Sequence, residues 1–441
     1  MSDFPSSRFE RGRIMAGTGL KVGTNYAKYH LRKRFGNHDD NSLSKLHDKN
    51  ARHIYSEFTK LRGSALKLAQ ALSLDNSVLP EEFIDVMAQA QYKVPPINKA
   101  LVRNIINKEL GNYPENLFDY FDPEAFAAAS LGQVHHAKLK DGRKVAVKIQ
   151  YPNIRETIAS DLGLAKILFR QIKNSENLDS YFKEVKNKLL EETDYLLEGR
   201  SIDEYHHRYS HGNFITPEWI KEFSTMKVLT MTFIEGYHMS DMIYNNPGQE
   251  ERDKFGQLLW DFFHAQINPS RTVHADAHPG NFLFTKEKKL GIIDFGCIKE
   301  CPSSFFDAFI SLVPAHLEKN ENMINELYLE LEMIRKNPSD PEYEKQFLQF
   351  CRSFGELLVK PYRTEFFDFG DPAFGEKLRE LAIIAASQPE PRGSKHFVYI
   401  ARVNLGLFHM LMKLKSKVRT VNAKNSIYDY LKKIPVNYGI T

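Results

Sequence analysis

Cysteine is scarce in this chain. Its 441 residues include only Cys297, Cys301 and Cys351, whose spacing forms no paired framework, so we expect no disulfide scaffold and favour a reducing compartment. Long apolar runs are also missing: none reaches about 18 residues, so no membrane-spanning helix is predicted. The amino terminus lacks the apolar core of a signal peptide. We therefore expect a cytoplasmic protein whose contact with a membrane, if it has one, is peripheral.

A strong excess of one charge is missing as well. The chain has 60 Lys and Arg against 56 Asp and Glu, a formal net charge of +4, which is too mild to indicate nucleic-acid binding, and we expect none. Only residues 1–36 are clearly basic, and their charges are interleaved with Leu20, Val22, Tyr26 and Leu31. This pattern is compatible with docking on an anionic membrane surface and equally with a solvated arm, so both interpretations stay open.

Residues 274–296 (HADAHPGNFLFTKEKKLGIIDFG) carry the groups that phosphoryl transfer needs. Asp276 stands five residues before Asn281, and an Asp-Phe-Gly begins at Asp294. Kinases use one carboxylate to meet the proton of an attacking hydroxyl, and an amide and a second carboxylate to hold Mg²⁺ on the nucleotide phosphates. We therefore predict Asp276 as the catalytic carboxylate, Asn281 and Asp294 as metal ligands, and ATP and Mg²⁺ as cofactors.

A β-hairpin is predicted between these two groups. Phe282–Phe284 and Leu290–Ile293 are short apolar strands around a Lys-rich turn. Such a hairpin would place the two metal ligands on opposite sides of one site.

A zinc site is the alternative for the same segment, because His274, Asp276 and His278 alternate as ligands on an extended strand can. Two observations count against it. Pro279-Gly280 breaks any helix after the cluster, and no later His or Cys pair has the spacing of zinc ligands.

A second β-hairpin is predicted upstream, with strands Val134–Lys140 and Arg143–Gln150 around a tight turn at Asp141-Gly142. In the second strand Lys148 shares a face with Ala146, opposite the Val and Ile side chains. A lone Lys within an apolar strand is costly to bury unless an anion pairs with it. Kinases place their phosphate-gripping Lys in a V-A-I-K strand, so we predict that role for Lys148.

The segment before this hairpin has an Ala run where protein kinases have a Gly-rich loop. Ala does not easily adopt positive φ, so we expect a stiffer loop of different shape, with a helix turn as the alternative. Val228–Phe233 is predicted as a strand that leads into the hinge, where the backbone of kinases contacts adenine. The predicted nucleotide-contacting residues are Ala127, Ala128, Ala129, Ser130, Val134, Ala146, Lys148, Met231 and Phe233.

Residues 154–208 are predicted to be helical and strongly charged. Within them Glu192 and Glu198 lie too far apart to be neighbours on one turn, so they can serve separate partners. From residue 251 the pattern is mostly helical apart from the catalytic hairpin. No A-P-E follows Asp294, so we expect no standard peptide-docking segment.

These motifs together resemble the UbiB/AarF family, the ABC1-type atypical protein-kinase-like proteins, whose members are linked to isoprenoid quinone biosynthesis and lipid homeostasis. The resemblance runs from Lys60 to Lys299 and more loosely to Leu414. It is carried by KLAQALSLDNSVLPEEF, VPP, AAASLGQVHHAKLKDGRKVAVKIQYP, EETDYLLEG, HADAHPGNFLF and IIDFG. It implies an α+β, bilobal protein-kinase-like fold, with a small β-rich N-lobe and a larger, mostly helical C-lobe.

The family's N-terminal K-x-G-Q motif falls on Lys67-Leu68-Ala69-Gln70. The resemblance implies that this helical extension lies over the nucleotide site, where a peptide substrate would otherwise bind. The motif's Gly is Ala69 here, and the added methyl could shift Lys67 or Gln70. The rest of the constellation is intact, so we do not interpret the chain as an inactive enzyme.

The resemblance also implies two ion pairs. The family's E-x-D motif falls on Glu192-Thr193-Asp194, whose Glu would pair with Lys67, and Lys148 would pair with Glu198. The predicted catalytic group is then Asp276, Lys148, Glu198, Lys67, Glu192 and Gln70.

Four segments are predicted: a basic arm at 1–48, a helical extension at 49–112, an N-lobe at 113–235 with inserted helices at 154–208, and a C-lobe at 236–441. The tail at 397–418 is apolar but interrupted by Arg402 and Asn404, so we predict a buried or amphipathic helix there and not the pair of membrane helices of some bacterial members.

Three functions remain open at this point. The first is Mg²⁺-dependent ATP binding and hydrolysis coupled to a membrane lipid or quinone precursor, in which the lipid link comes only from the resemblance. The second is a small-molecule kinase, since sugar and choline kinases also use H-x-D-x-x-x-x-N and a metal Asp. The third is a nucleotide-gated binding protein for lipid or protein that transfers no phosphate.

Overall fold

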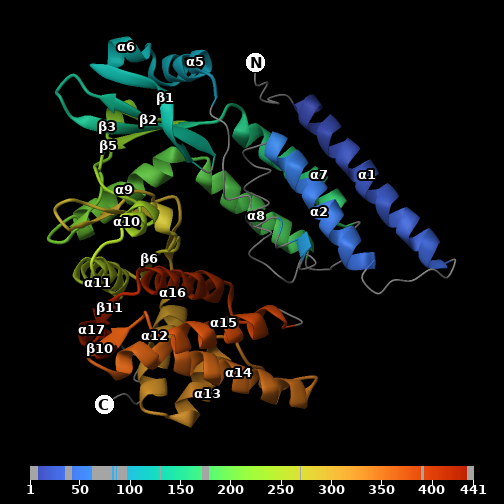
Figure 1. The fold of residues 1–441 in the computed structure, drawn as a ribbon, viewed down its shortest axis with the longest axis vertical. Coiled ribbons are helices and arrows are strands. Elements are labelled where there is room, and N and C mark those ends of the chain that lie inside the picture. Colours follow the sequence, from blue (N-terminus) through green and yellow to red (C-terminus); the bar gives the residue numbers. More distant parts are fainter. Residues whose placement is uncertain are drawn as a thin grey trace. The chain divides into compact units, whose positions relative to one another are not determined.

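The chain folds into two units, which are described here one at a time (Figure 1). The computed structural model describes residues 8–34, 42–61, 82–83, 86, 97–129, 131–170, 178–268, 270–388 and 392–434. Unit 1 comprises Met1–Arg200 and Glu218–Phe233, and unit 2 comprises Ser201–Pro217 and Ile234–Thr441. The division therefore falls inside one helix, α9 (Tyr195–Tyr209), and again between Phe233 and Ile234.

A four-stranded antiparallel sheet organises one half of unit 1. Its order is β1-β2-β3-β5, with β1 at Tyr120–Ala129, β2 at Gly132–Lys138, β3 at Lys144–Gln150 and β5 at Val228–Thr232. The predicted hairpin of β2 and β3 is present, and Gly142 in its turn has φ 93°, which favours glycine. Helix α5 (Lys99–Leu110) and the short α6 (Pro114–Leu117) pack next to β1.

One face of this sheet packs into a hydrophobic core. Val145, Val147 and Ile149 of β3 are fully buried and share a cluster with Val102 and Ile106 of α5. Because strand side chains alternate between faces, the even-numbered residues of β3 lie on the opposite face. The core therefore fixes which face carries Lys148.

Four helices form the second half of unit 1. These are α1 (Arg8–Arg34), α2 (Ser42–Leu61), α7 (Ile154–Arg170) and α8 (Leu178–Glu192), which lie side by side in Figure 1. The basic segment is thus a helix with one packed face, since Met15, Val22 and Tyr26 are buried in a cluster with α2 and α7. Helix α2 crosses residue 48, so the predicted boundary between arm and extension falls within a helix.

Unit 2 is mostly helical. Besides the end of α9 it contains α10 (Met239–Tyr244), α11 (Gln249–Ala265), α12 (Ser303–Leu317), α13 (Glu321–Glu330), α14 (Pro341–Val359), α15 (Pro372–Ala386), α16 (Lys395–Leu414) and α17 (Val421–Leu431). The predicted tail helix is α16, and its buried Leu407, Phe408 and Leu411 make it part of the core of unit 2. In the described part of the chain, no helix is long and apolar enough to cross a membrane.

Small sheets of unit 2 frame the phosphoryl-transfer motif. β7 (Phe282–Phe284) and β8 (Leu290–Ile292) form the predicted antiparallel hairpin, and β4 (Phe214–Ile215) pairs with β8 in parallel. β6 (Thr272–His274) pairs with β9 (Ile298–Glu300), and β10 (Phe366–Asp368) pairs with β11 (Lys417–Arg419).

His264 on α11 makes the stability of unit 2 depend on pH. Its Nδ1 donates to the Trp260 carbonyl and its Nε2 accepts from the Tyr362 hydroxyl, both at 2.7 Å, and burial lowers its pKa to about 4. Protonation therefore favours the unfolded chain. The stabilisation is complete above the ordinary pKa of His and is lost as the pH falls toward 4.

We expect His264 alone to lower the free energy of unfolding by about 2 kcal/mol between pH 7.5 and pH 5. Urea denaturation of the wild type and His264→Gln at both pH values measures this difference, which the variant should lack. Exposed His207→Gln is the control and should keep the wild-type pH dependence. Identical losses in wild type and His264→Gln would contradict the assignment.

Candidate active site

Lys148 lies in a central strand of the unit 1 sheet, paired with Val134 of β2 and Leu229 of β5. Its side chain is only 8% exposed, and its ammonium donates to both carboxylate oxygens of Glu198, at 2.8 and 2.9 Å. Glu198 lies in the first turn of α9 and is equally buried. This is the pairing that the resemblance implied, and it gives the buried cation the anion it requires.

The strand register places most of the predicted nucleotide residues on one face of the sheet. Ala127 pairs with Val134, Val134 with Lys148, and Ala146 with Met231, so all five side chains lie on the face opposite the core. Ala146, Lys148 and Met231 are buried on this face as well.

Phe233 follows β5 at the rim, where its ring lies 4.8 Å from that of His136. His136 pairs with Ala146, so it belongs to the same face, and the sequence interpretation missed it.

The Ala run is a strand and not the expected loop. Ala127, Ala128 and Ala129 end β1, so the helix-turn alternative is wrong as well. Ala128 pairs with Gln133 and lies on the other face from Ala127. The chain turns immediately afterwards, and Ser130 lies outside the described residues.

Gly132 opens β2 where two backbones come very close. A Cβ at this position would lie 2.2 Å from the Ile149 carbonyl oxygen, so no other residue fits without movement of the strand. The start of β2 is therefore held tightly against β3, which carries Lys148.

The E-x-D segment joins α8 to α9 beside β3. Gln150 donates from Nε2 to the Thr193 carbonyl at 3.0 Å, and Arg155 donates to the Thr193 hydroxyl at 3.1 Å. Glu192, the last residue of α8, is half-buried. Its predicted partner Lys67 and the neighbouring Ala69 and Gln70 lie outside the described residues.

Asp276 and Asn281 come together in unit 2, in the loop between β6 and β7. The Asn281 amide donates to the Asp276 carbonyl at 3.1 Å and to its Oδ2 at 2.9 Å. A single turn of 3₁₀ helix, Pro279–Asn281, ends the loop and makes this approach possible. The amide therefore fixes both the backbone and the side chain of Asp276.

Asp294 follows β8 and is tied to the same loop. The Ile293 N–H donates to the Asn281 carbonyl at 3.1 Å, and the His274 Nε2 donates to the Asp294 carbonyl at 2.7 Å. The Asp294 carboxylate accepts from the Gly296 N–H at 3.0 Å. The two predicted metal ligands thus stand at the ends of neighbouring strands of one hairpin.

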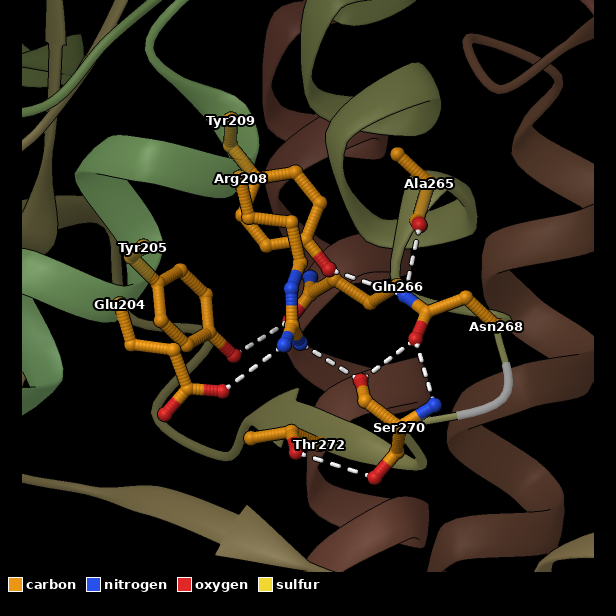
Figure 2. A network of polar contacts seen from close by, with 9 residues as sticks. All are labelled: Glu204, Tyr205, Arg208, Tyr209, Ala265, Gln266, Asn268, Ser270 and Thr272. Atoms are coloured by element: carbon orange, nitrogen blue, oxygen red, sulfur yellow. Dashed lines mark hydrogen bonds and ion pairs between the residues drawn. The ribbon is translucent and has the colours of Figure 1, made fainter.

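A polar network holds the strand that leads into this loop (Figure 2). Gln266 Oε1 accepts from the backbone N–H of His274 at 2.6 Å and from the Tyr205 hydroxyl at 3.1 Å. Arg208 pairs with Glu204 and donates to Ser270, which donates in turn to Asn268. These contacts join the end of α9 to the start of β6.

A cavity of about 730 Å³ lies beside this network, lined by Ser201, Glu204, Ser270, Arg271, Thr272, Ile298, Glu300, Cys301, Pro302 and Ser303. None of the predicted nucleotide or metal residues lines it, so it is separate from the candidate active site.

The zinc alternative finds no support in the described parts of the chain, which hold no group of three or more His, Cys, Asp or Glu placed for a metal ion. His274 Nε2 donates to the Asp294 carbonyl, and His278 Nδ1 accepts from the Gly280 N–H at 3.1 Å. Burial lowers the pKa of His278, helped by the positive charges of Arg402 and Lys413, so the neutral ring can act as this acceptor.

The sequence interpretation missed one contact of the loop at 275–281 between β6 and β7, the predicted catalytic loop. Arg402 of α16 donates from Nη2 to Asp276 Oδ1 at 2.5 Å, across 126 residues of chain. One turn further along the helix Gly406 packs on the loop, since a Cβ there would lie 2.4 Å from the Ala277 carbonyl oxygen. In the sequence Arg402 is only an interruption of an apolar tail, and no local signal links it to Asp276.

Residues 89–328 match the family model of the ABC1 atypical kinase-like domain, which is more than half of the chain. The chain belongs to this family. This ABC1 kinase-like chain is 27% identical over 398 residues to a probable serine/threonine-protein kinase of Dictyostelium discoideum, abkA, covering 85% of this chain and 69% of that protein.

Other relatives agree with this assignment. The chain is 27% identical to the atypical kinase COQ8, mitochondrial, of Saccharomyces cerevisiae, covering 97% of this chain and 86% of that protein. It is 32% identical to the AarF domain-containing protein kinase 1 of Mus musculus, where the match covers 56% of this chain and 48% of the mouse protein.

Among solved structures, the complex of Rv3197 with erythromycin from Mycobacterium tuberculosis is similar with a TM-score of 0.64 and 25% identity, covering 90% of this chain and all of that one. The predicted α+β, protein-kinase-like fold is therefore confirmed.

We expect Glu198→Gln to lower the free energy of unfolding by about 3–5 kcal/mol, because it leaves the Lys148 ammonium buried without its anion. The double variant Lys148→Met/Glu198→Gln should regain part of this loss. Urea denaturation measures both.

Lys138→Met is the matched control on the same sheet. It removes an exposed pair with Asp119, 47% and 52% exposed, and should cost less than about 1 kcal/mol. A loss in Glu198→Gln no larger than in this control would contradict the buried pair.

Proposed function

We propose that the chain binds and hydrolyses Mg·ATP as an atypical kinase-like ATPase. The observation that carries the proposal is the catalytic loop, in which the amide of Asn281 fixes Asp276 while Asp294 stands at the end of the adjoining strand. Family membership supports kinase-like chemistry. Carboxylate and amide oxygens are ligands that suit Mg²⁺, so Asp294 and Asn281 fit the metal.

Each side chain has a role in this proposal. Lys148, held by Glu198, grips the α- and β-phosphates, and Asn281 and Asp294 hold Mg²⁺, which neutralises charge on the phosphates when it is bound. Asp276 accepts the hydrogen bond of a water or hydroxyl and orients it for in-line attack.

We assign the nucleotide itself to the face of the sheet opposite the hydrophobic core. Ala127, Val134, Ala146 and Met231 form an apolar surface beside Lys148, and Phe233 stands at its rim. We assign Ala128, Ala129 and Ser130 to backbone contacts with the phosphates. Following the family motifs, we propose that Lys67, Gln70 and Glu192 belong to the catalytic group and that Lys67 pairs with Glu192.

We propose that turnover is coupled to a membrane lipid or an isoprenoid quinone precursor, which is the class of client linked to this family. A small-molecule kinase is the second candidate, because nothing in the loop distinguishes a water from a hydroxyl of a bound metabolite. A phosphorylated product in a metabolite screen would favour it. A nucleotide-gated binder would bind Mg·ATP without turnover.

We expect Asp276→Asn to bind Mg·ATP with nearly wild-type affinity but to lose a factor of about 10²–10⁴ in turnover, because the positioned carboxylate is removed. Asp294→Asn should lose Mg²⁺-dependent binding itself. Phosphate release and calorimetric titration of Mg·ATP measure the two effects.

Asp429→Asn changes an exposed carboxylate on α17 and should behave as wild type. Unchanged turnover in Asp276→Asn would overturn the assignment of that residue, and wild type that binds no nucleotide would overturn the proposed function.

We also propose peripheral contact of α1 with an anionic membrane. Lys21 and Lys28 are exposed together with Leu20 and Leu31, which are 74% and 57% exposed, and their spacing places them on one face of the helix. Basic residues near a headgroup layer each add about 1 kcal/mol of attraction, and the leucines can enter the interface.

Lys21→Glu/Lys28→Glu should weaken binding to phosphatidylserine-containing vesicles on the order of tenfold or more at physiological salt, as measured by sedimentation. The control Lys336→Glu/Lys345→Glu makes the same charge change at exposed positions of unit 2 and should have little effect. Equal losses for both pairs would show that net charge, and not α1, controls binding.

A further inference from the structure

Both carboxylate oxygens of Asp276 have a donor of their own. Oδ2 accepts from the Asn281 amide at 2.9 Å, and Oδ1 accepts from the Arg402 guanidinium at 2.5 Å. One donor alone lets a carboxylate rotate about its Cβ–Cγ bond, whereas two donors on different oxygens fix its plane. The direction in which the remaining lone pairs of Asp276 point is therefore set by Arg402 as much as by Asn281.

The helix that carries Arg402 is itself fixed against the catalytic loop. Gly406 lies four residues after Arg402, hence on the same face of α16, and packs so closely on Ala277 that a methyl would clash with its carbonyl. The following turns bury Phe408, Met410 and Leu411 in the core of unit 2. Arg402 therefore projects directly from a helix that is packed into the core of unit 2.

The contact contributes little to overall stability. The Arg402 and Asp276 side chains are 44% and 26% exposed, and ion pairs this accessible to water contribute little to the free energy of unfolding. Other charges that face the loop from α16 are His409 and Lys413, which act on His278, while Arg402 bonds the carboxylate itself. The contact can instead orient the Asp276 carboxylate.

We propose that Arg402 is a positioning residue for the reaction, which holds the Asp276 carboxylate in the one orientation that accepts a hydrogen bond from the attacking water or hydroxyl. The inference rests on the proposed function and deepens it, since it assigns part of the active site to the C-terminal helix α16. Arg402 acts through Asp276 and touches no reacting atom.

Arg402→Gln should lower kcat of ATP hydrolysis about 10- to 100-fold with the KM for Mg·ATP unchanged, because a misaligned catalytic group costs turnover and not nucleotide binding. Arg402→Lys keeps the charge on one donor and should recover part of kcat.

Gly406→Ala keeps Arg402 but should push α16 away from the loop at Ala277, because the added methyl would clash with the Ala277 carbonyl. It should show the same fall in kcat. A higher kcat in Arg402→Gln would overturn the proposal in favour of an inhibitory contact.

Arg419→Gln is the matched control. It removes an Arg of similar exposure that bonds Glu365 at 3.0 Å, far in sequence from the catalytic loop, and should leave kcat at the wild-type value. A loss of kcat in Arg419→Gln as large as in Arg402→Gln would show that the effect is not specific to Asp276.

A double-mutant cycle separates positioning from a general structural role. If Arg402 acts only through the Asp276 carboxylate, Arg402→Gln should reduce the residual activity of Asp276→Asn no further. Independent, multiplying losses would show that Arg402 acts elsewhere.

Hydrogen exchange tests the contact without turnover, so that failure of this inference can be told from failure of the proposed function. Arg402→Gln should raise amide exchange in residues 275–278 of the purified chain relative to wild type and to Arg419→Gln. If Arg402→Gln exchanges faster than wild type but the wild type hydrolyses no ATP, the proposed ATPase function is overturned and the contact between Arg402 and Asp276 stands. Unchanged exchange together with unchanged kcat would overturn the positioning role.

Discussion

The buried pair of Lys148 and Glu198 is the constraint on which unit 1 depends. An ammonium in a central strand, 8% exposed beside a hydrophobic core, is tolerated only with an anion in contact. That requirement fixes the first turn of α9 against β3, and the bond from Gln150 to Thr193 places the turn before it. The same helix continues to Tyr205, which supports Gln266 and through it the strand of the catalytic loop.

In unit 2 the proposed catalytic carboxylate, Asp276, is more exposed than the Lys148–Glu198 pair. Asp276 remains partly open to water and receives donors from the Asn281 amide and the Arg402 guanidinium, so it is held in place and not enclosed. Burial suits a cation that only has to grip phosphates, whereas a group that must meet a substrate needs access. The difference in exposure between the two pairs agrees with the roles proposed for them.

Family membership supports kinase-like chemistry, and the surface that we propose for the nucleotide differs from that of ordinary kinases. Alanines at the end of β1 stand where ordinary kinases have a Gly-rich loop, and Gly132 at the start of β2 lies tightly against β3. A strand end of this kind cannot move as a glycine loop does. The proposed nucleotide site therefore fits a fixed nucleotide pose better than closure over a docked peptide.

Local sequence patterns determined much of this molecule. The period-2 alternation of residues 144–150, the turn at Gly142 and the spacing of Asp276, Asn281 and Asp294 predicted both hairpins and the placement of Lys148, because these features depend on neighbours in the chain. The Ala run was mistaken for a loop, since pairing with β2 outweighs the weak strand preference of Ala. The basic segment was expected to be an arm, and only contacts with α2 and α7 bury one face of it. Arg402 is the clearest case: its partner lies 126 residues away, so only the packing of α16 on the catalytic loop decided its place.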